Sequence, residues 1–149
     1  MYYSFVMMKP DAVRRELVEE IVRRLTEQGL HIAMMSCRKA TPELIRSHYA
    51  EPIEKYGPDF QRKAEAYFQN ETVLPMLLSS SREDVVAYVR QIVGATDPTK
   101  AAPGTIRGDL GTDSLDRSMA ENRICEKMCI RDREKAIPSQ PTCSMGASC

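Results

Sequence analysis

The chain has 149 residues, of which 42% are hydrophobic and 28% are charged, and this balance indicates one globular domain with a single core. The 21 lysines and arginines equal the 21 aspartates and glutamates, so no net charge draws the protein to nucleic acid or to an anionic membrane. The five cysteines are odd in number and contain no CxxC pair, which argues against a disulfide framework or a zinc site and favours the cytoplasm.

The first thirty residues contain one predicted strand and one predicted helical region. Residues 1–13 have no basic flank before their short apolar run, unlike a signal peptide, and no segment of the chain has the length of a membrane span. Residues 2–8 are continuously apolar, so we expect a strand that is buried on both faces and central in a sheet. Pro10 is suited to begin a helix, and Gly29 is suited to end one.

Three further strands are predicted, over residues 30–38, over residues 72–78 and around residues 123–130. Pro75 lies inside the predicted strand 72–78. Because proline cannot donate a backbone hydrogen bond, it favours an edge position or a bulge there.

Helices are predicted between these strands from their caps and apolar spacing. Thr41 is suited to cap a helix that starts at Pro42, and Gly57 is expected to interrupt helical structure. Residues 81–84 resemble a capping box in front of the apolar stripe of a helix over residues 85–93. The order of elements predicts an α+β fold, a ferredoxin-like split βαβ sandwich in which helices pack on a four-stranded antiparallel sheet.

A small set of polar residues has the chemistry of a phosphate site. Lys9 directly follows an apolar strand and precedes a helix start, where a cation can face a phosphate. Arg90 and Arg107 carry guanidinium groups that bind phosphate oxygens in pairs, and the Thr96 hydroxyl is a further donor. The alternative, a solvated lysine and a mobile loop with solvated arginines, remains open from these residues alone.

Three motifs resemble the nucleoside diphosphate kinase family in order and spacing: KPDAV at residues 9–13, HYAE at residues 48–51 and GATDPTKAAPGTIRGD at residues 94–109. The likeness covers residues 3–125 and is weaker over residues 52–78. It implies transfer of the terminal phosphate of a nucleoside triphosphate to a nucleoside diphosphate through a phosphohistidine. The resemblance places phosphate contacts at Lys9, Arg90, Thr96 and Arg107, a supporting tyrosine at Tyr49 and a base-stacking ring at Phe60.

Two of the aromatic residues near these motifs also have a structural interpretation. Phe60 fits an apolar helical stripe, so core packing is an alternative to base stacking. His48 lies on the same predicted helix face as Leu44 and is expected to be structural. The resemblance further implies Mg²⁺ carried on the nucleotide and a homo-oligomer, either a hexamer or a tetramer, with no metal site formed by the protein itself.

The phosphate-accepting histidine of the family has no counterpart in this chain. No histidine follows His48, and the family pattern of Asn, two apolar residues and His falls on Lys127 to Ile130. We therefore expect a kinase-like domain over residues 1–126, an aberrant and disordered tail over residues 127–149, and doubtful activity. One hypothesis is a foreign or frame-shifted tail. The first alternative is a non-catalytic nucleotide-binding protein of the same fold. An RNA-binding module is a weaker alternative, because aromatic residues make up only 6% of the chain.

Overall fold

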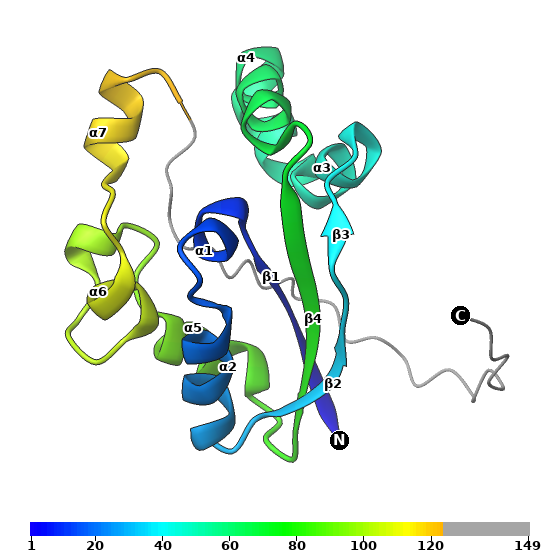
Figure 1. Cartoon of the computed structure of the whole chain (residues 1–149), viewed down its shortest axis with the longest axis vertical. Helices are drawn as coiled ribbons and strands as arrows, with labels where there is room; N and C mark the ends of the chain where they lie inside the picture. The colour runs from blue at the N-terminus through cyan, green and yellow to red at the C-terminus, as the bar shows by residue number, and fades with distance from the viewer. Residues whose placement is uncertain (124–149) are drawn as a thin grey trace, which may run out of the picture.

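The computed structural model describes residues 1–123, and Figure 1 shows a sheet with helices on both sides. The strands are β1 (Tyr2–Met8), β2 (His31–Met35), β3 (Arg38–Lys39) and β4 (Thr72–Ser80). The helices are α1 (Pro10–Arg14), α2 (Val18–Glu27), α3 (Pro42–His48), α4 (Ala50–Phe68), α5 (Val85–Val93), the 3₁₀ helix η1 (Pro98–Lys100), α6 (Ile106–Leu110) and α7 (Leu115–Ala120). None of the helices in this part of the chain is both long and apolar enough to cross a bilayer.

The predicted α+β class and the antiparallel four-stranded sheet are confirmed, although the four strands differ from those expected. β4 pairs antiparallel with β1 on one side and with β2 and β3 on the other. The segment predicted as one strand over residues 30–38 forms two short strands, and the strand predicted around residues 123–130 lies beyond the described residues except for Arg123. Within residues 1–123, β1 has β4 as its one neighbour, so its expected central position is not observed there.

Pro75 lies in the middle of β4, the strand with neighbours on both sides, so of the two possibilities that the sequence left open, an edge position and a bulge, the edge position is wrong. The neighbouring strand is interrupted opposite this residue: β2 ends at Met35, which pairs with Met76, and β3 begins at Arg38, which pairs with Val73. In the gap, the Ser36 amide donates to the Pro75 carbonyl at 3.0 Å. The missing donor of proline therefore faces the break between β2 and β3, which lowers its cost in a central strand.

Several predicted helix boundaries are confirmed by the backbone. Pro10 and Pro42 each begin a helix, and the Thr41 hydroxyl accepts a hydrogen bond from the Leu44 amide as an N-cap. Gly57, with φ 80° and ψ −168°, breaks the helical path inside α4. These positions were predictable because proline, glycine and a capping hydroxyl act on their immediate neighbours.

Two helix predictions need correction. The expected helix after Pro10 is divided, because Glu16 adopts φ 58° between α1 and α2. The capping box over residues 81–84 is wrong, since Asp84 makes no capping hydrogen bond and the Ser80 hydroxyl instead accepts from the Arg82 amide at 3.2 Å. The strand β4 extends to Ser80, so a turn occupies the space where the predicted cap would form.

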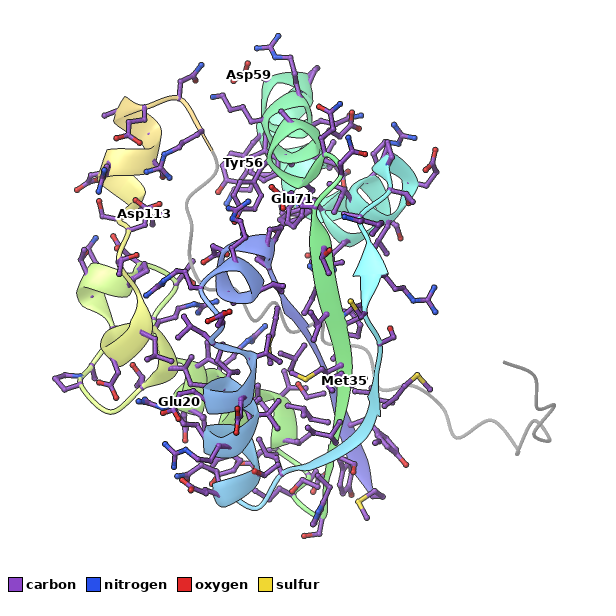
Figure 2. All side chains as sticks on the ribbon, in the orientation of Figure 1. Glu20, Met35, Tyr56, Asp59, Glu71 and Asp113 are labelled. Atoms are coloured by element: carbon purple, nitrogen blue, oxygen red, sulfur yellow. The ribbon has the colours of Figure 1, made fainter. Side chains whose placement is uncertain are left out.

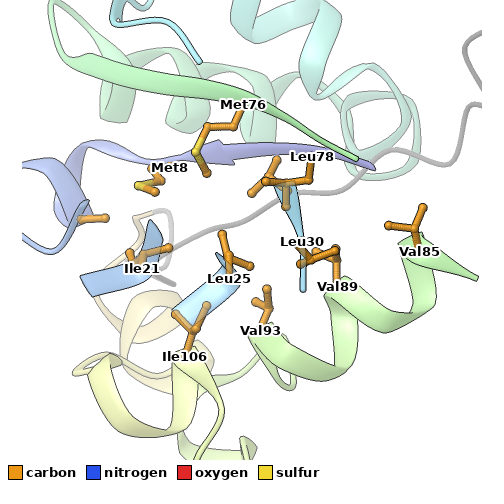
Figure 3. Close-up of a cluster of buried hydrophobic side chains, with 12 residues drawn as sticks. Met8, Ile21, Leu25, Leu30, Met76, Leu78, Val85, Val89, Val93 and Ile106 are labelled. Atoms are coloured by element: carbon orange, nitrogen blue, oxygen red, sulfur yellow. The ribbon is translucent and has the colours of Figure 1, made fainter. Parts of the chain in front are cut away.

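The core has two parts because successive residues of β1 point to opposite faces of the sheet. Val6 and Met8 face α2 and α5, in the cluster that Figure 3 shows with Ile21, Leu25, Val89 and Ile106. Met7 faces the other side, where residues of α3 and α4 cover it. This alternation fixes the end of β1, and with it Lys9, between two packed layers.

Candidate functional site

Lys9 lies at the junction of β1 and α1 and is buried, with 2% of its surface exposed. Its ammonium nitrogen lies 5.7 Å from the ring centroid of Tyr49, 5.6 Å from that of Tyr67 and 5.8 Å from that of Phe68. The alternative of a solvated lysine is therefore wrong. The sequence placed Lys9 at a strand end, but the three rings that surround it come from residues 40 or more positions later.

The aromatic surroundings explain how a cation can occupy this buried position. Removing an ammonium from water is costly, and each ring within about 6 Å offsets roughly 0.5–2 kcal/mol of that cost. The Tyr67 hydroxyl donates to Oδ1 of the buried Asp11 at 3.0 Å, which fixes the ring beside Lys9. Nothing in the sequence around Lys9 indicates that Tyr67, Phe68 and Asp11 would form its surroundings.

Arg107 is also buried, with 7% of its surface exposed, although it lies on the short helix α6. Its Nη1 donates to the Gly94 carbonyl at 2.9 Å, and the Gly94 amide donates to the Arg90 carbonyl at 2.9 Å. The structure thus brings Arg107 to the end of α5, where Arg90 stands in the last turn. Arg90 and Thr96 are exposed, so both can reach a ligand in solvent.

The loop between α5 and α6 is folded tightly on itself. Gly94 has φ 92°, and a Cβ there would lie 2.5 Å from the Thr105 hydroxyl oxygen. A Cβ on Gly108 would lie 2.1 Å from the Ala102 carbonyl oxygen. The Thr105 hydroxyl accepts from the Gly108 amide at 3.1 Å and so caps α6. The alternative of a mobile loop is not supported, because these contacts leave the backbone little room.

Two carboxylates stabilise the same loop. Asp97 is buried and accepts hydrogen bonds from the Thr99 amide at 3.1 Å and the Thr99 hydroxyl at 2.8 Å, which lower its pKa. Asp109 accepts hydrogen bonds from the Gly104 amide at 2.9 Å and from Arg24 at 2.6 Å. Both bonds lower the pKa of Asp109, and the bond from Gly104 has the larger effect. Both side chains hold the backbone that carries Thr96 and Arg107.

Phe60 and His48 both pack against Tyr49. The Phe60 ring is partly buried, 5.9 Å from the Tyr49 ring and 5.7 Å from that of Tyr56, which is labelled in Figure 2. This placement agrees with the core-packing interpretation of Phe60. His48 is 6% exposed, and its ring lies 5.9 Å from that of Phe5 and 5.0 Å from that of Tyr49, as expected for a structural histidine.

The two groups of candidate residues lie on elements that share one buried cluster. Lys9 directly precedes α1, and Ala12 of α1 shares one buried cluster with Val93 of α5 and Ile106 of α6. Figure 1 shows α1 between α4, which supplies Tyr67 and Phe68, and α6, which supplies Arg107.

A hollow of about 500 Å³ lies between the start of α3 and the end of α4, and none of the six candidate residues lines it. Ile130 lies outside the described residues.

Comparison with known proteins gives one consistent result. The family model described as nucleoside diphosphate kinase matches residues 3–124. A nucleoside diphosphate kinase of Archaeoglobus fulgidus is 43% identical over 110 residues, covering 74% of this chain and 70% of its own length. One from Thermus thermophilus is 39% identical and covers 90% of each chain, so that alignment runs past residue 124.

A solved structure supports the same assignment. The crystal structure of a nucleoside diphosphate kinase from Pyrobaculum aerophilum has a TM-score of 0.77 and 30% identity, and the match covers 90% of this chain and 88% of that one. The family model covers most of the chain, and the relatives and the solved structure agree with it. The chain therefore belongs to the nucleoside diphosphate kinase family, whose members are phosphotransferases.

Proposed function

We propose that the protein binds nucleoside tri- and diphosphates and that its fold is that of an enzyme that transfers the terminal phosphate from one to the other. One observation carries this proposal: Lys9, a cation with 2% of its surface exposed, stands beside α1 within a chain of zero net charge. Phosphate affinity in such a chain has to come from local charges. Family membership supplies the reaction class.

The proposed contacts divide between buried and exposed side chains. Lys9 and Arg107 are held by the fold before any ligand arrives, so little conformational freedom is lost when they meet phosphate oxygens. Arg90 and Thr96 are exposed and would close on the ligand from the solvent side. Tyr49 supports Lys9 through its ring. Phe60 was the candidate for base stacking, and its contacts with Tyr49 and Tyr56 favour a supporting role instead.

Magnesium is proposed to arrive on the nucleotide. Residues 1–123 contain no group of three or more histidine, cysteine or acidic side chains suited to hold a metal ion. In this proposal the phosphate oxygens are the principal ligands of the ion, and Lys9, Arg90 and Arg107 carry the positive charge on the protein side. Bound Mg²⁺ supplies further neutralisation of the phosphate charge.

The phosphoenzyme step is proposed to fail in the chain as it stands. That step needs an imidazole nitrogen to form a bond to the terminal phosphorus while the bond to the departing diphosphate breaks. Ile130 occupies the corresponding sequence position and has no lone pair. Of the two histidines in the chain, His48 packs between Phe5 and Tyr49, and His31 lies on β2, away from the Lys9 end of β1.

A second candidate function follows from the same substitution. A non-catalytic nucleotide-binding protein would keep Lys9 and Arg107 and lose the nucleophile. If the segment after residue 126 is instead foreign or frame-shifted, the active enzyme has a different C-terminal sequence. Reading the encoding DNA across codons 124–149 separates the two, because uninterrupted genomic coverage favours the non-catalytic protein.

We further propose that the protein is cytoplasmic and forms a homo-oligomer, either a hexamer or a tetramer. Sedimentation equilibrium measures the number of subunits directly.

The binding proposal is tested by titrating the protein with Mg-ADP in a calorimeter. Lys9→Met should weaken binding at least tenfold. The substitution removes a buried charge, and the loss of one charge-assisted hydrogen bond to phosphate has an effect of about that size. Lys39→Met is the matched control, because Lys39 is exposed on β3 and donates to the Asn70 carbonyl. Absence of ADP binding by the native chain would contradict the proposal.

The proposed loss of turnover needs a separate measurement. Incubation with ATP labelled on its terminal phosphate, followed by acid and base treatment, detects phosphohistidine as an acid-labile phosphoprotein. We expect none from this chain. A phosphoprotein that forms at the rate of an active relative would show that another residue accepts the phosphate.

A further inference from the structure

The helix α6 carries Arg107 and is only five residues long, from Ile106 to Leu110. A helix of this length does not hold its shape in water, so its position depends on contacts with the rest of the fold. Ile106 anchors one side, since it is fully buried in the core. The opposite, solvent side needs another attachment.

Arg24 on α2 provides that attachment across 85 positions of sequence. Its Nη1 lies 2.6 Å from Oδ2 of Asp109, and the other carboxylate oxygen, Oδ1, accepts from the Gly104 amide at 2.9 Å. The Nε of Arg24 donates to Glu20 at 2.7 Å, so the guanidinium is oriented from its own helix. Glu20 is labelled on α2 in Figure 2.

This arrangement ties both ends of the segment around Arg107 to α2. Asp109 follows Arg107 by two residues, and Gly104 precedes it by three. One carboxylate joins these two points, and Arg24 holds that carboxylate. Because Arg24 keeps only 22% of its side chain exposed, solvent and salt weaken the contact less than at an open surface.

We infer that Arg24 is a positioning residue for the phosphate site, acting through Asp109 on the placement of Arg107. The inference rests on the proposed nucleotide function. It assigns Arg24 no contact with the ligand. Its effect on affinity comes from holding Arg107 in place before the phosphate arrives, so that binding does not have to order the segment.

The neighbouring Arg23 offers a matched comparison. It has the same chemistry on the same helix, but its hydrogen bonds run to Glu20 and Glu27 within α2. Loss of Arg23 changes the charge of the protein and of α2 as much as loss of Arg24 does. A difference between the two variants therefore reports the link to Asp109 rather than charge or helix stability.

The experiment compares Arg24→Met with Arg23→Met by Mg-ADP titration and by hydrogen exchange of the ligand-free proteins. Arg24→Met is expected to weaken binding about fivefold, the low end of typical coupling between sites, and Arg23→Met to stay within about twofold. Exchange of the Gly104 and Asp109 amides should accelerate in Arg24→Met alone. Arg24→Lys should recover part of the affinity, because lysine keeps the positive charge near Asp109 but lacks the separate Nε donor that orients Arg24 on Glu20.

A thermodynamic cycle with Asp109→Asn gives a second test of the same link. Asp109→Asn keeps an acceptor for the Gly104 amide and loses the charge pair, so Arg24→Met should weaken binding no further in that background. If the native chain binds ADP and Arg24→Met binds it with the same affinity, the inference is overturned and the proposed function stands. Faster exchange with unchanged affinity also overturns it, because the contact is then structural. Failure of the native chain to bind ADP removes the proposed function and the inference together.

Discussion

Replacement of Gly94 by alanine tests whether the packing of the α5–α6 loop, rather than its backbone conformation alone, positions Arg107. Gly94 has φ 92° and ψ 179°, a region that is open to glycine and costs another residue about 1–3 kcal/mol. The added Cβ would lie 2.5 Å from Oγ1 and 2.8 Å from Cβ of Thr105, so the side chain that caps α6 must move. Loss of that cap costs about 1 kcal/mol more.

Gly57 provides the control because it has nearly the same backbone conformation, φ 80° and ψ −168°, and a Cβ added to it would meet no atom within 4 Å. Gly57→Ala should therefore show the conformational cost alone. We expect Gly94→Ala to be less stable than Gly57→Ala by about 1–2 kcal/mol. With a urea m-value of about 2 kcal/mol per M, the two midpoints would differ by about 0.5–1 M.

The assay is equilibrium unfolding in urea followed by circular dichroism, with Mg-ADP titration on the same samples. Gly94→Ala should also weaken ADP binding, because the Gly94 carbonyl accepts the hydrogen bond from Arg107. Gly57→Ala should bind normally. Equal urea midpoints for the two variants would refute the reasoning, since the close approach to Thr105 would then have no energetic consequence.

Two other predictions concern the stability of the folded chain. Tyr67→Phe removes the hydrogen bond to the buried Asp11 and should destabilise the protein by about 1–3 kcal/mol in urea unfolding, and no loss would show that water replaces the hydroxyl. The hydrogen bonds from Arg23 and Arg24 lower the pKa of Glu20 from 4.5 to about 2, so its stabilising effect is complete above pH 4.5 and is lost as the pH falls towards 2. Urea midpoints of Glu20→Gln should fall less steeply over this interval than those of the native chain, and parallel curves would contradict the assignment.

The sequence was most informative where a residue acts on its near neighbours. Pro10, Thr41 and Gly57 determine local backbone geometry, and the structure has a helix start, a cap and a break at those positions. The apolar run over residues 2–8 likewise forms a strand, which is buried on both faces over Val6 to Met8 and exposed at Tyr2 and Tyr3. These features depend on sterics and hydrogen bonds within a few residues, which a single sequence displays directly.

The sequence was least informative about partners far apart in the chain. Nothing near Lys9 shows that Tyr67 and Phe68 will enclose it, and nothing near Asp109 points to Arg24. Pro75 was ambiguous for the same reason, since its position in the central strand coincides with the break between β2 and β3 opposite it. Such pairings follow from the packing of whole elements, which local patterns do not specify.

The burial of Lys9 and Arg107 connects the neutral composition of the chain with its proposed ligand. A net charge of zero gives no long-range attraction for a polyphosphate. At physiological salt, the attraction between an exposed cation and a phosphate more than about 8–10 Å away is largely screened. Lys9 and Arg107, at 2% and 7% exposure, are screened much less. Because these few local charges supply the attraction in a chain of zero net charge, their placement beside the aromatic rings and through Asp109 determines how well they meet a phosphate.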